Sequence, residues 1–224
     1  MGDLLKSDVF NRTNTEGAVV SDATYNLVIG LVLCWGLLVN WLLVHYVSTT
    51  WLLSIGTAIF LIAYFASCFL GVYLFNSSKD PAISFIGYNF VVVPFGLVVN
   101  VVVSRYQPAL VLEAIQVTAM VTVAMMVLGS LFPRFFQAIY GGLVMALLAM
   151  IVIELFQIFV MHMHSDWIDW AVVFIFCGYV GYDWGRANQI PKTVDNAVDS
   201  AAAIYMDIIN LFLRILRILG RRKR

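Results

Sequence analysis

Two aspartates stand inside apolar stretches of this chain, and they carry its most specific chemical signal. Asp183 lies in CGYVGYDWGRANQI, and Asp207 lies 24 residues further on, in AAAIYMDIINLFLRIL. A charge at the centre of a bilayer costs at least about 2.5–3.5 kcal/mol, so such residues are usually functional and face a partner or water. The segments that carry them must lie close together. We therefore predict that the two carboxyl groups act as a pair.

Two carboxyl groups in contact have two chemical uses. They share one proton and titrate as a unit, which suits a pH-gated switch. They also attract a hard divalent cation, especially where carbonyl groups or waters complete the coordination shell. Asp183 and Asp207 are therefore predicted to be a pH sensor and a Ca²⁺ site, with Ca²⁺ as a transported or bound ion and no cofactor. The alternative is that each aspartate is protonated or bonded to backbone at a packed interface.

Other polar residues in the apolar segments are candidates for supporting the pair or lining an ion path. Glu113 lies about one turn after Pro108, where a helix dipole favours an acid, so a structural role and a pathway role both fit it. Glu154 lies near the end of its apolar run and is either hydrated at the interface or part of a path. The full set of supporting candidates is Glu113, Glu154, Asn210, Tyr182 and Tyr205.

The composition places these residues in a membrane protein. The chain is 62% hydrophobic and 12% charged, with a formal net charge of zero, whereas soluble domains are about 45–50% apolar and about 25% charged. We predict a polar N-terminal tail over 1–24, one multi-pass membrane domain over 25–220 and a basic tail over 221–224. The expected partners are the lipid bilayer, calcium ions and protons, with no nucleic acid and with protein partners left open. Cys34, Cys68 and Cys177 are read as small buried hydrophobic residues rather than as a disulfide framework.

A spanning helix needs about 20 apolar residues. Six runs meet this length, at 26–47, 51–75, 83–103, 109–132, 136–161 and 168–186, and a seventh at 197–219 is interrupted by polar residues. Short connections predict that neighbouring helices are antiparallel and packed together. The fold class expected is thus an all-α membrane protein, a bundle of seven helices.

The last segment leaves its topology open. An N-terminus on the inner side satisfies the positive-inside rule for the preceding loops. The basic run at 221–224 then obeys the same rule only if the last segment is re-entrant, and breaks it if that segment crosses the membrane. Arg214 and Arg217 are three residues apart and share one helix face. They either reach the interface with their long side chains or pair with an acid.

Several motifs around the aspartates resemble one known family. The stretches YMDIINLFL (205–213) and ILRILG (215–220) are similar to the C-terminal signature of the transmembrane Bax inhibitor motif family. GYD (181–183) and NQI (188–190) resemble its sixth-helix motif, and LEA (112–114) and GY (87–88) are weaker echoes. The signature covers about 40 residues closely, and the layout of seven segments covers nearly the whole chain.

The resemblance implies a bundle with the last helix at its centre and six helices around it. It implies a pH-sensitive calcium leak regulated by two carboxylates, which are Asp183 and Asp207 here. Some family members hold the pair with an arginine near the end of the second helix. In this chain residues 76–82 offer only Lys79, which lacks the bidentate fork of arginine. Lys79 and Arg186 are therefore the candidate latch residues.

The leading hypothesis from the sequence is a pH-regulated calcium leak channel gated by a proton-sharing aspartate pair. A proton-coupled calcium exchanger would use the same acids, and a non-transporting regulator or scaffold of cell-death or stress pathways is a further alternative. An intramembrane aspartyl protease is disfavoured because the residues before Asp207 lack the Gly-x-Gly-Asp motif, so no enzyme is expected. A prokaryotic plasma membrane is favoured as the location, with a eukaryotic endomembrane as the alternative.

Overall fold

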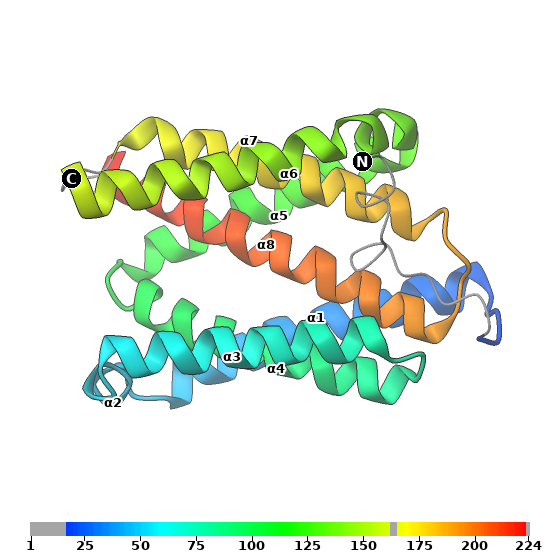
Figure 1. Cartoon of the computed structure of the whole chain (residues 1–224), viewed down its shortest axis with the longest axis horizontal. Helices are drawn as coiled ribbons and strands as arrows, with labels where there is room; N and C mark the ends of the chain where they lie inside the picture. Colours follow the sequence, from blue (N-terminus) through cyan, green and yellow to red (C-terminus); the bar gives the residue numbers. More distant parts are fainter. Residues whose placement is uncertain (1–16, 162–164, 223–224) are drawn as a thin grey trace. The chain divides into compact units, whose positions relative to one another are not determined.

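The computed structural model describes residues 17–161 and 165–222, and within them the regular structure is helical (Figure 1). This confirms the all-α prediction. These residues form eight α-helices and the short π-helical segment η1 (Gln157–Met161). The α-helices are α1 (Asp22–Tyr46), α2 (Thr49–Ser54), α3 (Thr57–Ser77), α4 (Pro81–Val103), α5 (Pro108–Leu131), α6 (Pro133–Phe156), α7 (Asp166–Ala187) and α8 (Val194–Arg222).

The predicted count of seven helices was wrong, because the second apolar run is broken near its start. Ser48 caps α2 by accepting a hydrogen bond from the Trp51 amide, and α2 ends six residues later. Gly56 then takes a φ of 86°, a left-handed conformation that glycine adopts without a steric cost. The chain turns at this glycine and starts α3, so one predicted run becomes a short helix and a long one.

Helix boundaries also refine the predicted tails. Ser21 caps α1, so the helix starts at Asp22, inside the predicted polar tail. Residues 1–16 of that tail lie outside the described part of the chain. In the predicted basic tail, residues 221 and 222 complete α8, and residues 223 and 224 lie outside the described part.

Five helical segments among the described residues are long and apolar enough to cross a membrane, at Asp22–Tyr46, Thr57–Ser77, Pro81–Val103, Pro108–Leu131 and Pro133–Met161. The protein is thus a multi-pass membrane protein. The run at 168–186 was expected to join this set, but α7 does not, and neither does α8. These two long helices carry most of the charged residues discussed below. Their lower hydropathy follows from their charges.

The chain divides into two compact units. Unit 1 comprises 1–104 and 190–202, and unit 2 comprises 105–189 and 203–224. In unit 1, α4 packs against α1 and α3, and the first turns of α8 are tied to both α1 and α4. The Tyr25 hydroxyl is 3.2 Å from the Ser200 Oγ. The Ser84 hydroxyl donates to the buried Asp195 carboxylate at 2.7 Å.

The end of α1 in unit 1 is closed by one side chain from α4. Asn100 is 2% exposed, and its Nδ2 donates to the Leu43 carbonyl at 2.8 Å and to the Val47 carbonyl at 2.9 Å. Its Oδ1 accepts from the Thr49 hydroxyl at 2.7 Å. The last carbonyl groups of a helix have no partner within the helix. Asn100 supplies that partner for the Val47 carbonyl and adds a second bond to the Leu43 carbonyl, which also accepts from the Val47 amide at 3.1 Å. It thus links α1, α2 and α4.

Replacing Asn100 with alanine should lower the stability of the protein by about 2 kcal/mol, because three hydrogen bonds of a buried amide are lost and the Val47 carbonyl loses its partner. The measurement is the thermal unfolding midpoint of the purified protein in detergent. The matched control is Asn188→Ala, which removes one exposed bond to the Trp184 carbonyl and should change the midpoint little. Equal midpoints for the two variants would contradict the capping role.

Unit 2 is built from α5, α6, α7 and the remainder of α8, with α7 packed against both α5 and α6. Glycine allows the closest approach. A methyl group at Gly129 of α5 would overlap the carbonyl oxygen of Gly181 on α7 and would lie 3.1 Å from its Cα. Small residues let helix backbones approach in this way in membranes. This contact fixes α7 two residues before Asp183.

Candidate functional site

The two aspartates predicted to pair do meet, in unit 2. Asp183 comes from α7 and Asp207 from α8, and their carboxyl groups lie within interaction range of each other. Asp207 is 6% exposed and Asp183 is half-buried. An ionised carboxylate only accepts hydrogen bonds, so a hydrogen bond between them needs one proton on one of the two groups. Two carboxyl groups in such close contact are expected to share one proton.

One carboxyl oxygen of the pair could accept a further hydrogen bond or bind a cation. Asp207 Oδ2 is buried, and no described residue forms a hydrogen bond with it. A buried polar atom without a hydrogen-bond partner is energetically costly. In native proteins such an atom commonly marks a place where a water molecule or an ion binds. This oxygen is where a water or a cation would contact the pair.

Tyrosines and one arginine surround the pair. Tyr182 stacks on Tyr140 of α6 with ring centroids 4.1 Å apart, and Tyr179 meets Tyr140 edge-on at 6.2 Å. Tyr140 and Tyr179 lie within electrostatic range of both aspartates, and Arg186 lies within that range of Asp183. Of the two candidate latch residues, the structure therefore brings Arg186 to the pair, while Lys79 lies exposed in the α3–α4 connection of unit 1.

Tyr140 and Tyr179 were not predicted, although the sequence holds a signal for both. Tyr179 precedes Asp183 by four residues, which places both on one face of α7. Tyr140 begins a seven-residue series on α6 that continues with Leu147 and Glu154. Such spacing keeps residues on one helix face.

The same spacing organises all three helices around the pair. On α7 the series is Asp169, Phe176 and Asp183, and on α8 it is Asp207, Arg214 and Arg221. The aspartates and Tyr140 form one layer, and Leu147 and Phe176 form the next. A third layer joins Glu154, Asp169 and Arg214. Successive layers are about 10 Å apart along α6 and α7. On α8, Arg214 is only seven residues, about 10 Å, beyond Asp207, and its long side chain reaches the third layer.

The third layer is an ionic cluster that the sequence reading left open. Arg214 donates to Glu154 Oε2 at 2.6 Å and to Asp169 Oδ1 at 2.9 Å. Arg217 contacts the same two acids, donating to Glu154 Oε1 at 3.1 Å and to Asp169 Oδ1 at 3.2 Å. Of the two roles considered for these arginines, pairing with an acid is the one observed. Asp169 is fully buried, and its partners hold α8 against α6 and α7.

Arg221 extends the cluster toward the end of α8. It contacts Asp169 Oδ2 at 3.0 Å and is also paired with Asp166. Asp166 and Asp169 were not predicted to be members of an ionic cluster. Both lie in the first turn of α7, where acids are common because they interact favourably with the helix dipole. The sequence does hold one signal: Asp169 precedes Asp183 by fourteen residues, a spacing that places Asp169 and Asp183 on the same face of α7.

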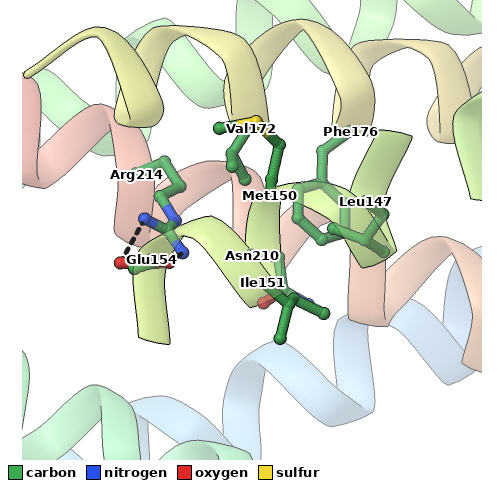
Figure 2. Close-up of a pocket in the computed structure, with 8 residues that line it drawn as sticks. All are labelled: Leu147, Met150, Ile151, Glu154, Val172, Phe176, Asn210 and Arg214. Atoms are coloured by element: carbon green, nitrogen blue, oxygen red, sulfur yellow. Dashed lines mark hydrogen bonds and ion pairs between the residues drawn. The ribbon is translucent and has the colours of Figure 1, made fainter. Parts of the chain in front are cut away.

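A cavity of about 250 Å³ lies in unit 2 and is lined by residues of α6, α7 and α8, including Glu154 and Arg214 of the ionic cluster (Figure 2). Its apolar wall comes from α6 and α7, and its polar groups are Glu154, Asn210 and Arg214. Asn210 donates to the Met206 carbonyl at 2.8 Å. Figure 2 shows the Arg214 guanidinium and the Glu154 carboxylate facing each other at one end of the lining. The remaining lining residues are Leu147, Met150, Ile151, Val172 and Phe176.

The other predicted supporting residues occupy different places. Tyr205 is fully buried on α8, two residues before Asp207. Glu113 is half-buried in the first turns of α5, sixteen residues before Gly129, the glycine that contacts Gly181. That separation corresponds to about 24 Å of helix. Glu113 is therefore not part of the aspartate layer.

The pair supplies two carboxylates for a cation. Among residues 17–161 and 165–222, no three His, Cys, Asp or Glu side chains are grouped to hold a metal ion. Ca²⁺ takes six to eight oxygen ligands, so water or backbone would supply the rest. Cys34, Cys68 and Cys177 are free thiols. The prediction that all three are buried was wrong, because Cys34 is exposed and Cys68 and Cys177 are half-buried.

Comparison with known proteins gives the family. The family model described as Inhibitor of apoptosis-promoting Bax1 matches residues 18–224. The chain is 28% identical over 141 residues to Inner membrane protein YbhL of Escherichia coli, covering 57% of this chain and 59% of that protein. It is 30% identical over 130 residues to Bax inhibitor 1 of Schizosaccharomyces pombe, covering 56% of this chain and 47% of that protein.

The chain thus spans about half the length of the curated relatives it matches. The family match is broader. It covers every described helix, both aspartates and the arginines of the ionic cluster. The resemblance seen in the motifs is confirmed, and this multi-pass membrane protein belongs to the Bax inhibitor family.

Proposed function

We propose that this protein is a pH-regulated calcium leak channel. The observation that carries the proposal is the close approach of the half-buried Asp183 and the buried Asp207, two carboxyl groups on two different helices. When the pair holds its proton, a hydrogen bond between the two groups joins α7 to α8 and the path is closed. When pH rises and the proton leaves, two carboxylates face each other and repel.

The open state follows from that repulsion. Either α7 and α8 move apart at the pair, or Ca²⁺ takes the place of the proton between the two carboxylates. Asp207 Oδ2 is already available as a ligand atom. In this scheme Arg186, which is also on α7, interacts with the Asp183 carboxylate and so competes with the cation for it. This is the latch role proposed for Arg186. The location proposed is a prokaryotic plasma membrane, which agrees with the name of the Escherichia coli relative, an inner membrane protein.

The test is calcium entry into liposomes that contain the purified protein, from pH 5 to pH 8 with the same pH on both sides. A leak needs only the calcium gradient, so flux should persist when an ionophore removes any proton gradient, and it should increase with pH. Flux that stops without an opposing proton gradient would identify a proton-coupled exchanger, which would use the same two acids.

A protein that gives no flux above empty liposomes at any pH would refute both transport functions. The proposal would then move to a membrane regulator without transport. The aspartate pair would in that case be a packing interaction between α7 and α8.

A further inference from the structure

The calcium path proposed above includes, in unit 2, the layer formed by Asp183 and Asp207. The next polar groups along α8 from Asp207 are Asn210 and Arg214, three and seven residues further on. All three share one face of the helix. Asn210 and Arg214 line the 250 Å³ cavity, and Asp207 lies one turn from its edge. The cavity is therefore the space that adjoins the pair.

The cavity is large enough for hydrated ions. One water molecule occupies about 30 Å³ in the liquid, so several waters fit. Its polar groups gather on one side, where an amide, a carboxylate and a guanidinium meet the space. A cavity that holds water needs such partners, whereas purely apolar cavities stay dry.

The charges beside the cavity are balanced. Arg214, Arg217 and Arg221 face three acids, Glu154, Asp166 and Asp169, in the ionic cluster. Two of these charges, Glu154 and Arg214, line the cavity itself. A calcium ion there is attracted by the carboxylate and repelled by the guanidinium. In a cleft, single charges such as these change the local concentration of a cation.

We infer that this cavity is a vestibule of the calcium path, and that the Glu154–Arg214 ion pair sets how readily a divalent cation enters it. The inference rests on the leak function proposed above. It adds a site that determines flux and is separate from the pair that senses pH. Glu154 favours the cation and Arg214 opposes it, so the two partners have opposite effects.

The experiment compares calcium flux at pH 8 for the wild type, Glu154→Gln, Arg214→Gln and the double variant. Losing the carboxylate should lower flux roughly tenfold, and losing the guanidinium should raise it roughly tenfold, because one charge in a focused cleft alters ion entry by this order. The double variant should return toward wild type. All four should keep their pH response, since Asp183 and Asp207 are unchanged.

A structural role predicts a different pattern. If the ion pair only holds α6 and α8 together, both single variants break the same contact and change flux in the same direction, which would overturn the inference. Wild-type protein without flux would instead refute the leak itself. The two failures are thus distinguishable in one series.

A second variant keeps the test valid if a charge substitution prevents folding. Asn210→Leu replaces the amide in the vestibule with an apolar group of nearly the same shape, without changing a charge. Because water in a cavity needs polar partners, this variant should lower flux at every pH. The matched control is Asn188→Leu. Asn188 is exposed and, like Asn210, donates from Nδ2 to the carbonyl four residues earlier at 2.8 Å. Equal flux in Asn210→Leu and Asn188→Leu would exclude the cavity from the path.

Discussion

Asp207→Asn should hold the calcium leak at its low, acidic level at every pH from 5 to 8. Asparagine has the shape of a protonated aspartic acid and can donate to Asp183, so the bond between α7 and α8 persists without a titratable proton. In the wild type, one proton changes the open fraction by at most about tenfold per pH unit, since each unit is about 1.4 kcal/mol. In the variant that slope should fall to nearly zero.

The direction of this effect follows from the state that holds the bond. The proton-bound pair is closed, so closure is favoured at low pH and lost as pH rises. Asp183→Asn should behave in the same way, because either acid can supply the shared proton. The control is Asp22→Asn, which removes an exposed carboxylate paired with Lys192 and should leave the pH profile intact. A wild-type profile in Asp207→Asn would refute the gate.

Gly129→Ala should destabilise the protein by about 3 kcal/mol, at the upper end of the usual cost of overpacking. The added methyl group meets the backbone carbonyl of Gly181, and no change of side-chain rotamer relieves the overlap. Helices α5 and α7 must separate. Asp183 lies two residues beyond the contact, so the variant should also weaken the pH response of the flux.

The matched control for this prediction is Gly141→Ala on α6. A methyl group at Gly141 has no other atom within 4 Å. Exchanging glycine for alanine inside a helix gains about 0.5–1 kcal/mol in helix propensity, so this variant should melt slightly higher than wild type. Thermal unfolding in detergent measures both. A midpoint for Gly129→Ala at or above that of Gly141→Ala would contradict the close packing of α5 on α7.

The aspartate pair could be predicted because its signal is local. A carboxylate inside an apolar run is costly wherever the run lies, and two such residues near matching family motifs identify each other. The long helices could be predicted for the same reason, since length and apolarity belong to single segments. Both predictions rest on signals contained within a single segment of the sequence, so they do not depend on how the helices pack.

The ionic cluster could not be assigned in this way. Arg214 fits equally well at a lipid interface or in an ion pair, and only the packing of α6 and α7 around it decides. Asp169 has a sufficient local reason to stand at the start of α7. The extra helix α2 was missed because the run at 51–75 is apolar throughout, and the break depends on one glycine dihedral, at Gly56.

The central claim is that one proton shared by Asp183 and Asp207 closes the calcium path. The most direct measurement is the infrared absorption of protonated carboxyl groups in the same liposomes that are used for flux, titrated from pH 5 to pH 8. We predict one carboxyl band that disappears as flux increases, with the same midpoint, and that is absent in Asp207→Asn. A band that persists in this variant, or flux that changes with pH while the band does not, would contradict the account.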